Sequence, residues 1–136
     1  VSTTGNIRWS GTVVSGREDV ASLLASIRKS PQETFWTVVA DRAGNILEIL
    51  RYSKGVRAGA PVSGTDVAGR VLNIKGATRA YFVHNHPSGD AAPSPEDVAL
   101  TRKLVEAGKL MDVEVLDHVV VGRGQFVSLR ERGMGF

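Results

Sequence analysis

Residues 84–97 read HNHPSGDAAPSPED, and the rest of the chain is organised around this stretch. Two histidines, His84 and His86, stand two positions apart at the end of the apolar run YFV. Side chains two positions apart in an extended strand point to the same side, so both imidazoles can face one ion. Ser94 is predicted to begin a helix with Asp97 in its first turn. A catalytic zinc site uses about three nitrogen or oxygen ligands and leaves one position open for water. His84, His86 and Asp97 supply that set.

Each part of this stretch also has a purely structural interpretation. Two histidines can end a strand and hydrogen-bond the following turn. Ser-Pro-Glu-Asp is a common helix start, with serine at the N-cap, proline in the first turn and acids beside it. For Asp97 the two interpretations are compatible, because a helix N-terminus favours the ionised carboxylate that a metal requires. Asp90 and Glu96 are the rival carboxylates, and we expect Asp90 to lie in a turn and face solvent.

The composition indicates an ordinary globular domain. The chain has 136 residues, of which 42% are hydrophobic and 23% charged, a length that suits one domain with a core of its own. We therefore interpret residues 1–136 as a single domain. Its first residue is Val1 rather than methionine, as in a piece of a longer protein.

Several classes of protein are disfavoured by the same composition. No apolar run approaches the roughly 18 residues of a membrane span, and no signal-peptide pattern begins the chain. The absence of cysteine excludes a disulfide framework and a cysteine zinc site. These features fit a cytoplasmic location. The net charge of +3 is mild, and the basic residues are scattered rather than gathered in a stripe, so nucleic-acid binding is weakly supported.

The first half of the chain predicts strands, one helix and a hairpin. Clusters of β-branched and aromatic residues predict strands over 7–14, 33–40 and 46–51. A helix over 15–29 begins with the capping box SGRE and ends before a proline. Between the second and third strands, DRAGN forms a hairpin turn, and the glycine-rich residues 52–64 form a mobile loop.

The second half predicts two more helices and a final group of strands. One helix begins at Ser63 or Thr65, with Gly76 as candidate C-cap. The other covers 94–110, with Leu100 and Leu104 facing inward. Strands are predicted over 79–84, 113–115, 118–121 and 125–129, the last two as a hairpin. This order favours a mixed α/β domain in which helices pack on one mixed sheet.

The stretch 84–97 resembles the JAMM (JAB/MPN) metalloprotease signature, in which H-x-H-P is followed after six residues by S-x-x-D. Every fixed position matches. HNHPSGD, with LDHVVVG and SLRERG further on, is similar to the bacterial RadC branch of that family, most strongly over residues 33–133. The resemblance implies the JAB/MPN fold, a curved mixed β-sheet with three helices packed on it, related in shape to the cytidine deaminases.

The resemblance also implies roles for residues outside the histidine pair. In this family a glutamate at the start of an early strand is the general base, and Glu33, before TFWTVV, matches that position. The rival is Glu48, whose structural interpretation is an outward residue of an alternating strand. The serine of the signature, here Ser94, helps to hold the tetrahedral oxyanion. His118 is either a structural histidine at a strand start, which we favour, or a group that supports the metal ligands.

We therefore expect a zinc-dependent hydrolase that cleaves a peptide or isopeptide amide in a peptide or protein substrate. The zinc ion lowers the pKa of a bound water, and Glu33 takes the proton and passes it to the leaving amine. Two alternatives stay open: a metal-stabilised binding module that contacts DNA or another protein, and a nucleic-acid hydrolase that uses the same zinc.

The RadC branch is named for DNA repair, for which the sequence offers little support. An HxH amidohydrolase barrel needs roughly 250 residues, and cytidine-deaminase chemistry uses cysteine ligands, so both are disfavoured. The substrate and the oligomeric state are not determined by the sequence.

Overall fold

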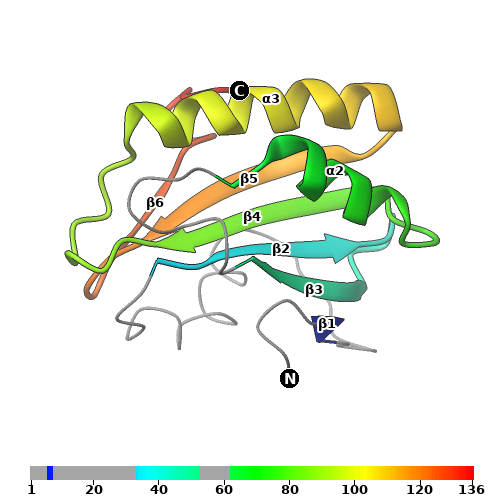
Figure 1. Ribbon diagram of the computed structural model, residues 1–136, viewed down its shortest axis with the longest axis horizontal. Coiled ribbons are helices and arrows are strands. Elements are labelled where there is room, and N and C mark those ends of the chain that lie inside the picture. Colours follow the sequence, from blue (N-terminus) through cyan, green and yellow to red (C-terminus); the bar gives the residue numbers. More distant parts are fainter. Residues whose placement is uncertain (1–5, 8–32, 53–61) are drawn as a thin grey trace.

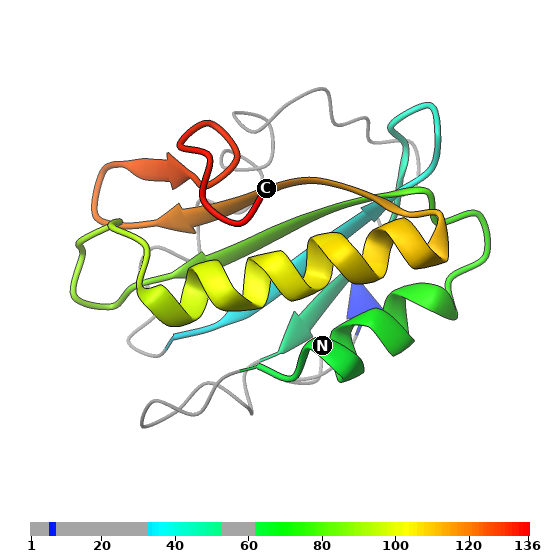
Figure 2. The ribbon, with the colours of Figure 1, turned by 90° about the horizontal axis from the view of Figure 1, so that it is seen from above.

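The computed structural model describes residues 6–7, 33–52 and 62–136, and the structural statements below concern these residues. They form a mixed α/β arrangement, a mixed sheet with two helices on one face (Figure 1, Figure 2). The elements are β1 (Asn6–Ile7), β2 (Phe35–Ala40), β3 (Ile46–Tyr52), α2 (Gly64–Leu72), β4 (Arg79–Asn85), α3 (Pro95–Met111), β5 (Glu114–Val121) and β6 (Phe126–Ser128). Their order in the sheet is β1-β3-β2-β4-β5-β6.

The middle strand β4 has neighbours that run in different directions. β2 pairs with it antiparallel and β5 pairs with it parallel. A parallel pair needs a crossover connection, and α3 supplies that connection between β4 and β5 (Figure 1). The helix therefore begins near the carboxyl end of β4. β2 begins at the same end of the sheet, with Phe35 opposite His84. This end is where the sequence-predicted site residues meet.

Both faces of the central strands are buried. The helix-covered face contributes to one apolar cluster, which includes Phe35, Val39, Leu50, Val67, Val71, Phe82 and Leu104. The opposite face contributes to a second, which includes Val38, Ile49, Tyr81, Val83, Val119 and Val121. Successive strand residues point to opposite faces, so a strand buried on both sides reads as a continuous apolar run. The buried polar residues His84 and His118 interrupt this pattern.

The predicted elements of the second half are confirmed, with one open alternative decided and two corrections. The cap of α2 is Ser63, whose hydroxyl accepts from the Asp66 N–H, rather than Thr65. The C-cap is Asn73 rather than Gly76, which lies in the following turn with φ 87°. The segments 113–115 and 118–121 are not separate strands, because β5 runs without interruption from 114 to 121. A register shift against β4 falls at this point, because Ala80 pairs with Val115 and Tyr81 with Asp117, which leaves Leu116 as the extra residue.

The expected curvature of the sheet and the expected three helices are met only in part, and some predicted elements lie outside the described residues. The sheet is not strongly curled (Figure 1, Figure 2), although we expected a curved one. Two of the three expected helices are described. The predicted helix 15–29 with its capping box, the strand 7–14 beyond Ile7 and most of the predicted loop lie outside the described residues. Neither described helix combines the length and the apolar character that a membrane crossing requires.

Candidate metal centre

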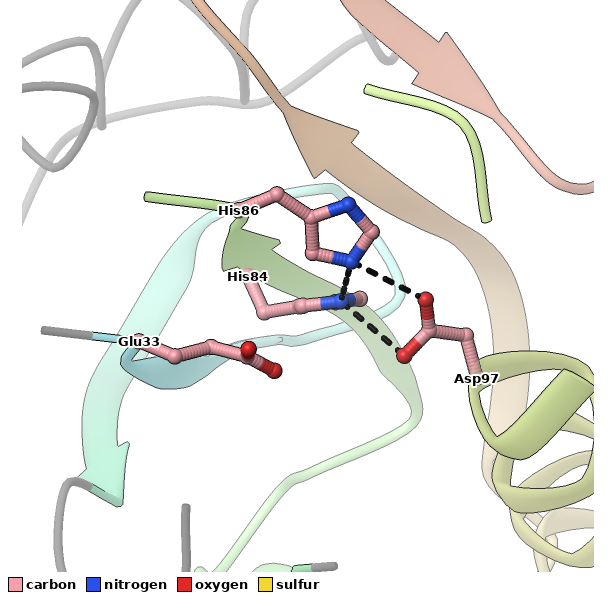
Figure 3. Close-up of side chains that lie close together, drawn as sticks. All are labelled: Glu33, His84, His86 and Asp97. Carbon is pink, nitrogen blue, oxygen red and sulfur yellow. Dashed lines mark hydrogen bonds and ion pairs between the residues drawn. The ribbon is translucent and has the colours of Figure 1, made fainter. Parts of the chain in front are cut away.

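Four side chains converge at the end of β4: Glu33, His84, His86 and Asp97 (Figure 3). Each offers one ligand atom, and these four atoms lie within 4.8 Å of one another. His84 belongs to β4 and His86 follows it, while Glu33 stands just before β2 and Asp97 lies in the first turn of α3. The structure thus brings together the three predicted metal ligands and the predicted general base. Within the described part of the chain, Asp90, Glu96 and Glu48 are not members of this group.

The capping box of α3 holds the carboxylate of Asp97. Its Oδ2 accepts a hydrogen bond from the Ser94 N–H at 2.7 Å, and its own N–H donates to Ser94 Oγ at 3.1 Å. Its two oxygens lie 3.1 Å from His84 Nε2 and from His86 Nε2. Burial by itself would raise the pKa of Asp97, but the hydrogen bonds from the two imidazoles outweigh it and hold that pKa well below its usual range. Asp97 is therefore ionised, as a metal ligand must be.

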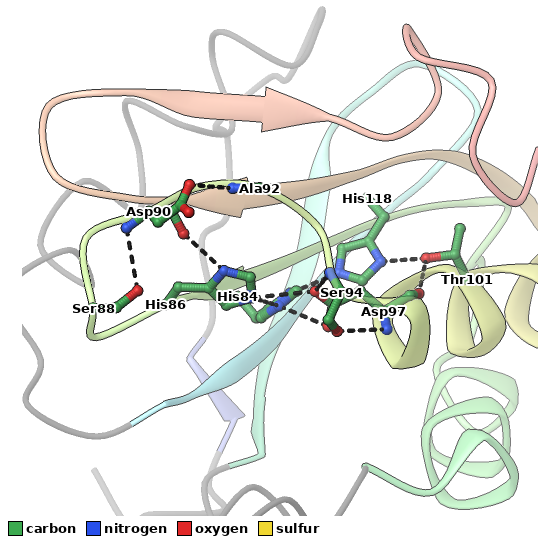
Figure 4. A network of polar contacts seen from close by, with 9 residues as sticks. All are labelled: His84, His86, Ser88, Asp90, Ala92, Ser94, Asp97, Thr101 and His118. Atoms are coloured by element: carbon green, nitrogen blue, oxygen red, sulfur yellow. Dashed lines mark hydrogen bonds and ion pairs between the residues drawn. The ribbon is translucent and has the colours of Figure 1, made fainter.

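His86 is oriented by a backbone group of the turn that follows it. Its Nδ1 lies 2.9 Å from the carbonyl oxygen of Asp90 (Figure 4), so Nδ1–H donates and Nε2 faces Asp97. The hydrogen bond to Asp97 raises the pKa of His86. Asp90 thus supports the site through its carbonyl, while its carboxylate accepts from the Ala92 N–H. The rival Glu96 is exposed at the start of α3.

His84 is supported by a fully buried partner, His118. His118 Nε2 lies 2.8 Å from His84 Nδ1, and the other ring nitrogen of His118 contacts the hydroxyl of Thr101 (Figure 4). Burial holds the pKa of His118 well below its usual range, so the ring is neutral. We expected His118 to begin a strand, but it lies within β5. It is both a satisfied core histidine and a neighbour of a metal-ligand candidate.

Two further residues that support the site were not indicated directly by any sequence pattern. Asn85, between the two histidines, is fully buried. Its Oδ1 accepts from the N–H and the hydroxyl of Thr34 at 2.7 and 2.9 Å, which fixes the residue next to Glu33. Thr101 stands one helical turn after Asp97, and that i, i+4 spacing was the one signal that pointed to it.

Glu48, the rival general base, is remote from the site. It pairs with Val39, four residues along β2 from the pair of Phe35 and His84. At about 3.3 Å per residue this is roughly 13 Å along the strand. We expected Glu48 to point outward, but it is 8% exposed. Directly paired residues share a face, so Glu48 lies on the helix-covered side with Val39, which belongs to the cluster there.

Comparison with known proteins agrees with this geometry. A family model described as a RadC-like JAB domain matches residues 14–134. The chain is 45% identical over 119 residues to a UPF0758 protein of Chloroflexus aggregans, covering 87% of this chain and 52% of that protein. A UPF0758 protein of Methanosarcina mazei is 37% identical over 121 residues, covering 88% and 52%. One of Desulforudis audaxviator is 33% identical over 126 residues, covering 93% and 54%. The chain spans about half the length of these curated relatives.

Proposed function

This chain belongs to the RadC-like JAB domain family, and from that premise we propose that it is a zinc-dependent hydrolase of peptide or isopeptide amides. The observation that carries the proposal is the convergence of four ligand atoms, from two imidazoles and two carboxylates, within 4.8 Å. Two nitrogens and one oxygen, with a further carboxylate beside them, are a donor set typical of a catalytic zinc site.

The residues present fit a zinc ion held by His84, His86 and Asp97. All three are attached to the end of β4 or the start of α3, and each is oriented by a hydrogen bond. When bound, the ion would supply Lewis acidity toward a water molecule and the substrate carbonyl.

Two other side chains have roles in this proposal. Glu33 accepts a proton from the attacking water and returns it to the leaving amine. Its location just before β2, beside Thr34 and its bonds to Asn85, supports that assignment. Ser94 Oγ accepts the Asp97 N–H, which leaves the hydroxyl proton available for an oxyanion. The N-cap therefore does not compete with the proposed role of Ser94.

The test is a pair of matched substitutions, Glu33→Gln and Glu48→Gln, assayed on fluorogenic peptide and isopeptide substrates with zinc supplied. An amide has nearly the shape of a carboxylate but accepts no proton at neutral pH. Glu33→Gln should keep the fold and the zinc and lose about 10²–10⁴-fold in turnover. Glu48→Gln should turn over substrate like wild type, because Glu48 lies far from the site.

Other outcomes would favour the alternatives. Tight zinc binding with a function that Glu33→Gln leaves unchanged would favour a metal-stabilised binding module. Activity on single-stranded or duplex DNA that requires Glu33 would favour a nucleic-acid hydrolase. A wild-type protein that binds no zinc when supplied with an excess would contradict the site assignment itself.

A further inference from the structure

We infer that Thr101 and His118 are positioning residues that keep a proton on Nδ1 of His84, which leaves Nε2 of that ring as the nitrogen that binds the metal. The inference rests on the proposed ligation of zinc by His84. It concerns a chain of three hydrogen bonds that runs from the backbone of α3 through β5 to β4 (Figure 4).

The first hydrogen bond of this series can have its donor on only one side. Thr101 Oγ1 lies 2.7 Å from the carbonyl oxygen of Asp97, and a carbonyl oxygen can only accept. The single hydroxyl proton of Thr101 therefore points at Asp97. In its contact with the ring of His118, Thr101 must then accept, and His118 Nδ1 must carry a proton.

The second link follows from the first. A neutral imidazole has one N–H and one lone pair. With its proton on Nδ1, His118 presents a lone pair at Nε2, which lies 2.8 Å from His84 Nδ1. His84 must therefore donate from Nδ1, which leaves Nε2 as the nitrogen whose lone pair can bind a metal ion. That atom lies 3.1 Å from Asp97 Oδ1 and 3.1 Å from His86 Nε2.

The two candidate histidine ligands reach the same tautomer by different means. His86 donates its Nδ1–H to the backbone carbonyl of Asp90, which no substitution removes. His84 depends on two side chains, Thr101 and His118, which substitutions can remove. The chain also ends on the carbonyl of Asp97, whose carboxylate is itself a proposed ligand. The first turn of α3 therefore supplies one ligand and sets the tautomer of another.

Thr101→Val is the variant that tests this series of hydrogen bonds, with Thr101→Ser as its matched control. Valine has the shape of threonine but cannot accept the His118 proton. The Nδ1–H of the buried ring then has no acceptor at this position. Moving that proton to Nε2 makes His118 the donor to His84, which accepts at Nδ1 and carries its own proton on Nε2, 3.1 Å from Asp97 Oδ1. Serine keeps the hydroxyl and should restore the wild-type tautomers.

Two readouts are measured. Long-range ¹H–¹⁵N correlation of the metal-free proteins reports which ring nitrogen of each histidine is protonated. Wild type and Thr101→Ser should show His84 and His118 protonated on Nδ1, while Thr101→Val should show His84 without a proton on Nδ1. Zinc titration should show an affinity about 10–100-fold lower in Thr101→Val, the usual effect of losing a partner that orients a ligand.

The outcomes separate this inference from the proposed function. A wild-type His84 without a proton on Nδ1 overturns the inference, and that measurement needs neither zinc nor a folded variant. Wild-type tautomers together with wild-type zinc affinity in Thr101→Val overturn it as well. If the tautomers are as expected but wild type binds no zinc, the hydrogen-bond chain stands and the proposed metal site fails.

Discussion

Two helices of this protein begin with the same S-x-x-D pattern but have different surroundings. In α2 the hydroxyl of Ser63 accepts the N–H of Asp66 at 3.2 Å, and in α3 that of Ser94 accepts the N–H of Asp97 at 3.1 Å. The serine hydroxyl therefore caps both helices in nearly the same way, and in α3 the Asp97 carboxylate also accepts from the Ser94 N–H. Asp66 is exposed, whereas Asp97 is 9% exposed and faces two imidazoles. A helix cap becomes a candidate metal ligand only where another element places partners opposite it.

The largest difference between the two helix starts should be in zinc binding. Asp97→Asn removes a charged ligand, while Asp66→Asn removes a solvent-exposed charge. We expect Asp97→Asn to lower zinc affinity by more than roughly 100-fold, since even the partners of metal ligands are worth about 10–100-fold. Isothermal titration calorimetry with zinc measures the affinity of both variants. Equal affinities for the two variants would break the comparison and remove Asp97 from the site.

The same pair of variants separates metal-dependent from intrinsic stability. Zinc at 100 times its dissociation constant should stabilise wild type and Asp66→Asn by about 2.7 kcal/mol, and Asp97→Asn by much less. Two apolar clusters on the faces of the sheet predict that the chelated wild type still folds. Circular dichroism checks this prediction, and an unfolded chelated wild type would show that the metal is structural.

The pH dependence of the metal-free protein should also distinguish the two aspartates. The pKa of Asp97 lies below its unfolded value of about 3.9, so its stabilising contribution is complete above that pH and is lost as the pH falls. The pKa of His86 is raised by its hydrogen bond to Asp97. The contribution of His86 to the stability of the folded protein is therefore complete below about pH 6.5 and is lost as the pH rises through the folded pKa.

The stability difference between wild type and Asp97→Asn should therefore be largest between about pH 4 and 6.5. Denaturant unfolding across pH 2–9 measures it, with Asp66→Asn as the control, whose stability difference should be smaller because Asp66 is exposed. A difference for Asp97→Asn as small as that of the control would mean that the carboxylate and the imidazoles are not coupled.

The smallest effect should be the one that the two helices share. Ser63→Ala and Ser94→Ala each remove an N-cap hydroxyl and should each destabilise the metal-free protein by about 1 kcal/mol. Thermal unfolding of the two variants measures this, and threonine at either position should recover most of the loss. A much larger loss at Ser94 would indicate that its hydroxyl supports the site as well as the helix.

Several features were predictable because they depend on near neighbours in the chain. The HxH spacing at the end of a strand and the capping box after it involve residues at most four apart, so local geometry settles them. β5 was harder to predict, because Asp117 looks like an interruption. Its carboxylate accepts from the His118 and Arg130 N–H groups and from the Ser128 hydroxyl. These bonds let a charged residue lie within a buried strand.

By itself, the sequence determined which side chains with metal-binding chemistry end β4 and begin α3. Strand and helix periodicity act over a few residues, and they suffice for that. Only the tertiary structure decided which distant groups meet them. The register of β2 on β4 brings Glu33 to the histidines and leaves Glu48 far away. The packing of α3 on the sheet brings Thr101 to His118 and completes the hydrogen-bond chain to His84. Register and packing depend on burying both faces of the whole sheet at once, and no local pattern contains that information.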